Sequence, residues 1–520
     1  MSSLPQLIRT NVQRNGDKIA TRFKDRERTW HAVQDRVARL AAGLRSLDVG
    51  EGDRVAVLAL NSDRYFEFYF GASWAGAVFV PVNNRLAPAE FVQWLNDSGS
   101  QVLFVDDNYL QPVAEIRDRL ESVQHMVYMG DGDLPQGYLA YEALLNAQAP
   151  VAPSSRSGDD MAGLFYTGGT TGKSKGVMLS HRNLTYNVLQ ARPFIPVTAD
   201  DVFLHAAPMF HLADGFFFML GTTMGCTHVI VPTFEPNLVL QTLQDDEIKT
   251  ALLVPTMINM VVNHPDISRY DLSSLRRLVY GASPMPEAVI RKAMEVIPGV
   301  DFYQAYGQTE SSPVITVMGP EYHTTAGPRA GKLKGAGRVV AGIDLAILDD
   351  AGKELPVGSV GEVCIRGDNV MLGYWNLPDV TAETLRDGWL HTGDGGRLDD
   401  EGMLFIVDRV KDMIVSGGEN VYSAETEQAV YSHPAVAECA VIGIPHESWG
   451  EQVHAIVRLK DGSTLTAQDL IDHCQALIAG SKCPSSVEFR DEPLPLSGAG
   501  KILKKDLRAP YWAGQDRNVS

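Results

Sequence analysis

Apolar residues follow two different patterns along the chain. Between about residues 53 and 304, short apolar runs such as RVAVLAL (54–60), VFVPV (78–82) and QVLFV (101–105) alternate with longer amphipathic stretches. Strands that are apolar throughout and separated by helices are typical of parallel sheets with helices on both faces. We therefore predict that this region is an α/β structure.

The pattern changes after about residue 330. Glycine and aspartate become frequent, and the strands predicted at 341–348, 361–367 and 402–408 are separated by turn residues. Short strands joined by turns favour antiparallel pairing, so we predict a smaller β-rich subdomain between about 330 and 409. Beyond it, the predicted strands and helices form a small α+β domain over 412–520.

Size and composition restrict the class of protein. A chain of 520 residues is too long for one ordinary core, so at least two domains are expected. The net charge of −19 argues against broad nucleic-acid binding, which requires a basic face. The five cysteines are scattered without a C-x-x-C pair, which argues against a disulfide framework or a zinc site and favours a reducing, cytoplasmic location.

No segment predicts export or insertion into a membrane. Residues 1–10 lack the apolar core of a signal peptide. The longest apolar stretch, 215–232, is interrupted by threonines and a histidine and is shorter than the roughly 20 residues of a membrane span. We predict a buried helix and strand there. Contact with a membrane surface stays open, and so does the choice between a monomer and a homodimer.

The segment 164–183, LFYTGGTTGKSKGVMLSHRN, combines an apolar strand with a loop of glycine, threonine, serine and lysine. Such a loop can point backbone N–H groups at phosphate oxygens, while its lysines neutralise their charge. A Walker A loop is excluded because its first glycine would fall on Thr167. The alternative is a flexible surface linker. The predicted phosphate-binding residues are Thr167, Gly168, Gly169, Thr170, Thr171, Gly172, Lys173 and Lys175.

A second candidate segment, YQAYGQTESSP, follows a predicted strand at 303–313. Tyr306 offers a flat face for a purine, and Glu310 offers a hard oxygen for Mg²⁺ beside phosphates. A tyrosine in the core and a glutamate that caps a helix are the structural alternatives. Gly281, Ala282 and Ser283 end another strand, where small residues permit close approach of a flat ligand.

These segments resemble the motifs of the adenylate-forming superfamily, which includes acyl-CoA synthetases, 4-coumarate-CoA ligases, luciferases and peptide-synthetase adenylation domains. The family loop usually reads Y-T-S-G-T-T-G-x-P-K-G, and here Gly168 replaces the serine and Ser174 the proline. The resemblance covers nearly the whole chain. It implies an α/β fold with two doubly wound sheets and a β-rich subdomain in an N-terminal AMP-binding domain (1–408), a hinge (409–411), and a mobile α+β C-terminal lid (412–520).

The resemblance also implies roles for single residues. Tyr306 would pack on adenine, and Glu310 would hold Mg²⁺ together with Thr167. Asp394, in GWLHTGD, would bind both ribose hydroxyls with the help of Arg409; a turn aspartate that caps its own backbone is the alternative. The remaining implied residues are Gly281, Ala282, Ser283, Gly307 and Thr309 around the nucleotide, Lys411 as the hinge residue, and Gly417 and Gly418 beside the pantetheine tunnel of coenzyme A.

Two residues are candidates for catalysis. Lys501, in GKILK, matches the last motif of the family, and an ammonium there would lower the repulsion when a carboxylate attacks an α-phosphate. The alternative is a solvated basic tail. His211 could orient the carboxylate or gate the tunnel, or be a core histidine, and Asp214 is expected to cap the next helix. The predicted acyl-pocket residues are Phe210, Gly215, Phe216, Met257, Pro313 and Val314.

Together these residues predict an ATP-dependent, Mg²⁺-dependent acyl-CoA synthetase that releases AMP and pyrophosphate. The apolar pocket favours a medium- or long-chain fatty acid, whereas Pro313 and Val314 also resemble aryl-acid ligases for coumarate and ferulate. An adenylation enzyme that loads another acceptor and a luciferase-like oxygenase are further alternatives. A non-catalytic nucleotide sensor of this fold should have lost Lys501 or Glu310, and both are present.

Overall fold

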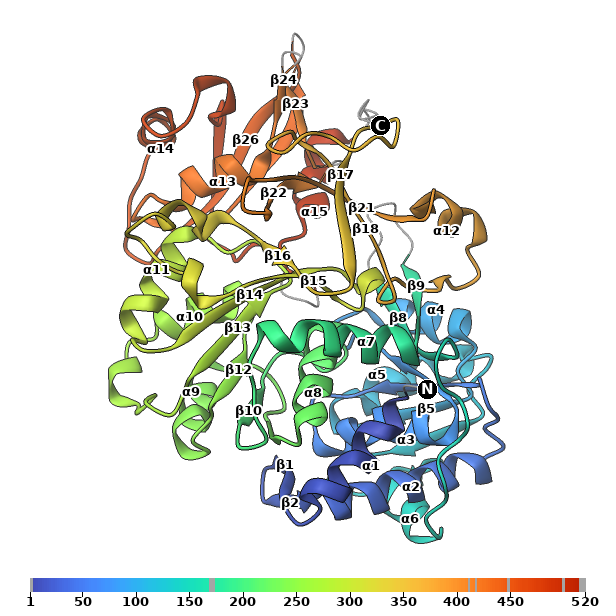
Figure 1. The fold of residues 1–520 in the computed structure, drawn as a ribbon. Coiled ribbons are helices and arrows are strands. Elements are labelled where there is room, and N and C mark those ends of the chain that lie inside the picture. The colour runs from blue at the N-terminus through green and yellow to red at the C-terminus, as the bar shows by residue number, and fades with distance from the viewer. Residues whose placement is uncertain are drawn as a thin grey trace.

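The computed structural model describes residues 3–167, 174–409, 412–416, 419–446, 449–497 and 501–513. The described strands form three sheets, and Figure 1 shows the smallest of them above the other two. The α/β class, the large N-terminal part and the small C-terminal domain predicted from the sequence are confirmed.

The largest sheet has 14 strands, and its strands from β14 to β1 run parallel. The strands predicted between about 330 and 409 are antiparallel, as expected, but they continue this same sheet through β15 rather than forming a sheet of their own. In path order the strands are β17 (Ile343–Leu348), β18 (Gly361–Gly367), β21 (Trp389–Leu398), β22 (Met403–Arg409), β16 (Gly337–Val339), β15 (Val314–Met318), β14 (Asp301–Gly307), β13 (Arg277–Gly281), β12 (Thr250–Leu252), β10 (Val202–His205), β11 (Thr227–Ile230), β1 (Ile19–Phe23) and β2 (Arg26–Thr29), with β20 (Leu385–Arg386) beside β21.

The second sheet has eight strands and is parallel except at one end. There β8 and β9 form an antiparallel pair, joined by the candidate phosphate loop, and β9 also pairs with β19. In path order the strands are β19 (Gly373–Tyr374), β9 (Lys175–Ser180), β8 (Met161–Thr167), β4 (Val78–Pro81), β3 (Arg54–Leu58), β5 (Val102–Val105), β6 (His125–Tyr128) and β7 (Leu139–Ala140).

Helix α3 (Asp63–Ala75) is buried along its whole length because it lies between the two large sheets. The Tyr69 ring lies 4.8 Å from that of Phe79 in β4, and the Phe66 ring lies 4.9 Å from that of His228 in β11. The other helices of this part are α1 (Leu4–Asn15), α2 (Trp30–Ser46), α4 (Pro88–Ser98), α5 (Leu110–Ile116), α6 (Tyr141–Asn146), α7 (His181–Ala191), α8 (Leu212–Met224), α9 (Pro236–Asp245), α10 (Pro255–Val262), α11 (Glu287–Val296) and α12 (Pro378–Thr384).

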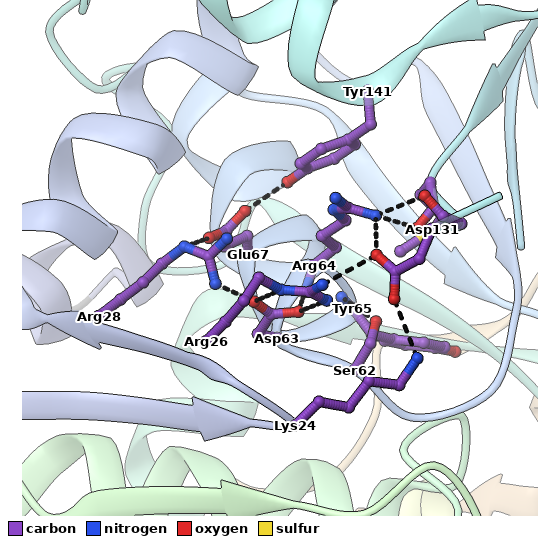
Figure 2. Close-up of polar contacts among 12 residues, drawn as sticks. Lys24, Arg26, Arg28, Ser62, Asp63, Arg64, Tyr65, Glu67, Asp131 and Tyr141 are labelled. Carbon is purple, nitrogen blue, oxygen red and sulfur yellow. Dashed lines mark hydrogen bonds and ion pairs between the residues drawn. The ribbon is translucent and has the colours of Figure 1, made fainter. Parts of the chain in front are cut away.

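Ion pairs fasten the β1–β2 hairpin to helix α3 (Figure 2). Asp63 is buried in the first turn of α3 and accepts hydrogen bonds from Arg26 at 2.9 and 3.0 Å and from Arg28. Because the hairpin forms one edge of the 14-stranded sheet, these bonds link that sheet to the helix between the sheets. A buried carboxylate is stable only when it is paired in this way.

Glu67 continues the same arrangement one turn further along α3. It accepts hydrogen bonds from Arg36 Nε at 2.6 Å and from the Tyr141 hydroxyl at 2.8 Å, and it lies 3.3 Å from Arg28 Nε. Helices α2 and α6 are thereby joined to α3. We call the set the N-terminal ion cluster, which comprises Arg26, Arg28, Arg36, Asp63, Arg64, Glu67, Tyr141 and Glu142.

The C-terminal part contains the five-stranded sheet and its own hydrophobic core. Its strands are β23 (Ile414–Ser416), β24 (Glu419–Val421), β25 (Val436–His446), β26 (Gly450–Leu459) and β27 (Ser486–Arg490), and its helices are α13 (Ser423–Tyr431), α14 (Ala467–Gln475) and α15 (Lys504–Arg508). The buried helix and strand predicted at 215–232 are α8 and β11. None of the helices within the described residues has the length and apolarity needed to cross a membrane.

Candidate nucleotide and acid site

The carboxyl ends of β13 and β14 lie side by side and form a flat, open edge. Gly281 pairs with Ala305, and a Cβ at Gly281 would lie 2.1 Å from the Ala305 carbonyl oxygen, so only glycine fits. Ala282 has a φ of 66°, which turns the chain away from the strand. Ligands of open α/β sheets bind at such strand ends. The structure therefore brings Gly281, Ala282, Ser283, Tyr306 and Gly307 to one edge.

Tyr306 connects this edge to the predicted ribose-binding residue. Its hydroxyl donates a hydrogen bond of 2.8 Å to Asp394 Oδ2. Asp394 lies on β21 and pairs through its backbone with Arg409 on β22. Tyr306, Asp394 and the strand that carries Arg409 thus lie next to one another, although 88 residues separate Tyr306 from Asp394 along the chain.

Glu310 lies in a short turn, Thr309–Ser311, just after β14. Its carboxylate is 8% exposed and accepts a hydrogen bond of 2.8 Å from the Tyr374 hydroxyl. Lys175 Nζ lies 4.6 Å from the centre of the Tyr374 ring. Burial raises the pKa of Tyr374 far above its usual value, with the charge of Glu310 adding to the shift, so the phenol stays a neutral donor.

Tyr374 is a site residue that the sequence analysis missed. It lies on β19, which pairs with β9 directly after the phosphate loop. Its only signal in the sequence is an aromatic residue after Gly373, and no spacing relates it to Glu310. Thr167, the last residue of β8, pairs with Lys175, so these two residues close the base of the loop.

His211 has two structural roles that the sequence did not reveal. It is the N-cap of α8, because its Nδ1 accepts a hydrogen bond of 3.1 Å from the Ala213 N–H. Burial, together with the positive charges of Lys501 and Arg85, lowers the pKa of His211 to about 3. The imidazole is therefore neutral. Lys501 lies within electrostatic range of it, so the structure brings the two candidate catalytic residues together.

Arg85 and Asp214 complete this view of α8. Arg85 was not predicted; an arginine in the loop after the apolar strand at 78–82 was its only signal. The expected capping role of Asp214 is wrong. His211 caps the first N–H groups of α8 instead. Asp214 is fully buried, and its carboxylate lies 3.1 Å from His205 Nδ1.

The predicted acyl-pocket residues lie in two places. Phe210, Phe216 and Val314 are buried in the core cluster around α3 and α8. Gly215 is buried in the same part of α8, and a Cβ there would meet Leu212 at 3.3 Å and Phe218 at 4.0 Å, both in the same helix. Met257 instead packs in a separate cluster with α10 and α11, and the structure does not join it to the others.

A hydrogen-bonded frame fixes the position of Pro313 and Val314. The Asn187 side chain accepts from the Val314 N–H at 3.0 Å and donates to the Val314 carbonyl oxygen at 2.6 Å. A Cβ at Gly307 would lie 1.8 Å from the Pro313 carbonyl oxygen. The chain after β14 is therefore held against β14 itself, with both residues beside the flat edge.

Several predicted residues lie outside the described part of the chain. These are Gly168, Gly169, Thr170, Thr171, Gly172, Lys173, Lys411, Gly417 and Gly418, and for Arg409 only the backbone is described.

Two family models match the chain. The model named AMP-binding enzyme matches residues 8–375, and the model named AMP-binding enzyme C-terminal domain matches residues 425–501. The chain belongs to the AMP-binding enzyme family. The first match contains the flat edge, the phosphate loop and Glu310, and the second ends at Lys501.

The chain is similar in sequence and structure to several CoA ligases. It is 38% identical to a feruloyl-CoA synthase of an Amycolatopsis species over 93% of this chain and 94% of that protein. It is 36% identical to a long-chain-fatty-acid–CoA ligase of Thermus thermophilus over 93% and 90%. The solved structure of the anthranilate CoA ligase AuaEII in complex with anthranoyl-AMP gives a TM-score of 0.90 at 28% identity, covering 98% of this chain and 97% of that one. The AMP-binding enzyme described here is thus an acid–thiol ligase of the acyl-CoA synthetase type within the adenylate-forming superfamily.

Proposed function

We propose that the protein joins a hydrophobic carboxylic acid to coenzyme A in two steps. The acid first attacks the α-phosphorus of ATP, which forms an acyl-adenylate and releases pyrophosphate. The thiol of coenzyme A then attacks the acyl carbon and displaces AMP. The proposal is carried by the 2.8 Å hydrogen bond that joins Tyr306 to Asp394 at the strand edge, together with the charge of Lys501, from the C-terminal part, which reaches His211, the N-cap of α8. Positioning and charge stabilisation suffice for this chemistry.

Each residue of the site has a role in the proposal. Lys501 places an ammonium near the attacking carboxylate and the α-phosphate, where negative charge gathers. Tyr306 stacks on adenine, and Asp394 binds the ribose hydroxyls. Gly417 and Gly418 border the path of the thiol, and residues 409–411, with Lys411 as the hinge residue, separate domain 1–408 from the lid 412–520.

Glu310 suits a magnesium ion, because it is a nearly buried carboxylate whose described hydrogen-bond donor is a neutral phenol. Glu310 and Thr167 would hold the ion, which when bound neutralises charge on the phosphates. Tyr374 keeps the Glu310 carboxylate oriented from the other side.

The acyl pocket supports two classes of acid. Its buried apolar residues, Phe210, Phe216 and Val314, favour a medium- or long-chain aliphatic acid. A specific observation favours an aryl acid as the second candidate: Phe218, one turn after Gly215, packs against Phe66 and Tyr69 with ring centres 5.7 and 4.8 Å apart. This aromatic packing limits the depth available behind α8 and so suits a short, flat acid.

A panel assay tests the proposal. Pyrophosphate release is measured with ATP, Mg²⁺ and coenzyme A for fatty acids of increasing length and for cinnamic and benzoic acids, and the CoA thioester is identified by mass spectrometry. An adenylate formed without a thioester would indicate a different acceptor, and light emission in oxygen would indicate a luciferase-like reaction. Absence of pyrophosphate release with every acid would refute the ligase function.

A further inference from the structure

The strand that carries Asp394 contains an irregularity opposite β18. Cys364 pairs with His391, and Glu362 pairs with Gly395. Two steps along β18 therefore lie opposite four steps along β21. Thr392, Gly393 and Asp394 lie opposite Val363 alone, so β21 has two extra residues here, and we call these three residues the β21 bulge. Bulges next to active sites commonly redirect a side chain. Here the bulge carries the residue proposed to bind ribose.

Both carboxylate oxygens of Glu362, on β18, bond to β21: one to the bulge and one to the residue directly before it. Its Oε1 accepts a hydrogen bond of 2.9 Å from the Gly393 N–H, and its Oε2 lies 2.7 Å from His391 Nδ1. Arg386 Nη2 lies 3.5 Å from the same Oε2. Gly393, in the bulge, and His391, directly before the bulge, are therefore held by a single side chain on the neighbouring strand.

A second connection comes from Thr392. Its hydroxyl donates to the Val363 carbonyl oxygen at 2.7 Å and accepts from the Asp394 N–H at 3.1 Å. Asp394 then receives the hydrogen bond from Tyr306 described above. Glu362 holds the Gly393 N–H directly before Asp394, and Thr392 links the Asp394 N–H to the Val363 carbonyl, so the backbone that carries the Asp394 carboxylate is held from β18 at two points.

Glu362, Cys364 and His391 also have the side-chain types of a metal site, with their ligand atoms within 4.8 Å of one another. The guanidinium of Arg386, however, lies 3.1 Å from His391 Nδ1, the atom nearest to the other two groups. A positive charge at this place opposes a bound cation. The geometry thus favours a hydrogen-bonded support for the bulge over a metal centre.

We propose that Glu362 is a positioning residue that orients Asp394 and thereby sets the preference of the enzyme for the ribose 2′-hydroxyl of ATP. The inference rests on the proposed function, in which Asp394 binds the ribose. Glu362 touches no substrate in this proposal. Its effect on the reaction passes entirely through the β21 bulge.

The test compares ATP with 2′-deoxy-ATP as substrates of the wild-type enzyme and of Glu362→Ala. In the wild type, kcat/KM should favour ATP, because a site built to bind a hydroxyl rejects the analogue that lacks it. In Glu362→Ala the KM for ATP should rise roughly tenfold, and the preference for ATP should fall by a similar factor, since a displaced carboxylate loses its geometry. The KM values for the acid and for coenzyme A should stay within about twofold, because neither ligand contacts the ribose carboxylate.

Two further variants separate positioning from folding. Glu362→Gln keeps an oxygen that can accept from the Gly393 N–H, so it should restore part of the preference. Thr392→Val removes the second connection and should lower the preference by itself. Asp344→Asn is the matched control: its carboxylate, on β17, binds Arg366 on β18 at 2.7 Å and lies on the side of β18 away from the β21 bulge, so the preference should not change.

Distinct results would overturn the two proposals. If wild-type enzyme does not consume ATP with any acid, the proposed function fails. If it consumes ATP but Glu362→Ala retains the full preference over 2′-deoxy-ATP, or if the wild type has no preference, the positioning role of Glu362 is wrong. One equivalent of zinc in the purified wild type that is absent from Cys364→Ser would also overturn it.

Discussion

Two nearly buried glutamates, Glu67 and Glu310, show how the same side chain serves different purposes. Glu67 belongs to the N-terminal ion cluster, where Arg36 and Tyr141 donate to it. Glu310 accepts from the neutral Tyr374, and among the described residues no basic side chain forms an ion pair with it. A carboxylate that is paired with arginines is already neutralised by their positive charge. One supported only by a phenol remains able to bind a cation.

The basic residues of the N-terminal ion cluster and those of the candidate site differ in the same way. Arg26 and Arg28 are engaged by Asp63, so their charges are balanced inside the fold. Lys501 instead lies near His211, and the charges of Lys501 and Arg85 add to the burial that lowers the pKa of this imidazole. The candidate site therefore places two positive charges near a neutral imidazole, whereas the arginines of the cluster are paired with buried carboxylates.

The largest expected effect concerns Lys501. Lys501→Ala should lower the rate of adenylate formation by about 10²–10³-fold, because it removes the charge that stabilises the transition state. Thioester formation from a supplied acyl-adenylate should remain largely intact, and both half-reactions can be followed by rapid quench. Lys505→Ala, an exposed neighbour, is the control. Equal loss of both half-reactions would contradict the assignment.

A smaller loss is expected for Glu310→Gln. The amide keeps an acceptor for Tyr374 but loses the charge that Mg²⁺ requires, so kcat/KM for ATP should fall by roughly 10–100-fold and more Mg²⁺ should be needed for half-maximal rate. The melting temperature should change little. Activity that is unaffected across a Mg²⁺ titration would show that the metal is held elsewhere.

For Glu67→Ala the comparison predicts the opposite result. Stability should fall by about 3–5 kcal/mol, since the arginines lose their buried partner, while kcat per folded molecule stays within about twofold. The shift of the urea midpoint measures the first quantity and activity before unfolding measures the second. Asp35→Ala removes an exposed pair with Arg39 and should cost less than about 1 kcal/mol. A catalytic defect in Glu67→Ala without loss of stability would contradict the structural role that distinguishes Glu67 from Glu310.

The smallest effect is a pH dependence at the rim of the N-terminal ion cluster. Burial alone raises the pKa of Glu142, but hydrogen bonds and charge from Arg36 and Arg64 outweigh it and lower the pKa to about 2, from 4.5. The stabilisation is therefore present above pH 4.5 and is lost as the pH falls from 4.5 towards 2. Glu142→Gln should show a weaker loss of stability over this range in urea titrations at each pH. An identical acid response in both proteins would refute the contribution of this group.

Sequence patterns were most successful where local chemistry determines structure. The apolar strands follow from composition and spacing, and the order of α8 and β11 was predicted from one interrupted apolar stretch. The pairing of Tyr374 with Glu310 could not be predicted, because it depends on β19 joining β9 in three dimensions. The same holds for the continuous 14-stranded sheet, whose antiparallel end looks like a separate unit in the sequence.

Asp214 illustrates a second limit. Its position near the start of α8 favours a cap, but His211 lies at the correct distance from the first N–H groups and takes that role. Capping depends on backbone angles at one residue, which composition does not specify.

The cap formed by His211 also determines which hydrogen the ring can offer. Its Nδ1 accepts from the Ala213 N–H, and the neutral ring then carries its proton on Nε2. In the proposed function, the acid would therefore meet a hydrogen-bond donor rather than a base. The Nε2–H can donate a hydrogen bond to an ionised carboxylate oxygen, but it offers no acceptor for an ammonium group. This tautomer by itself therefore disfavours amino acids as substrates.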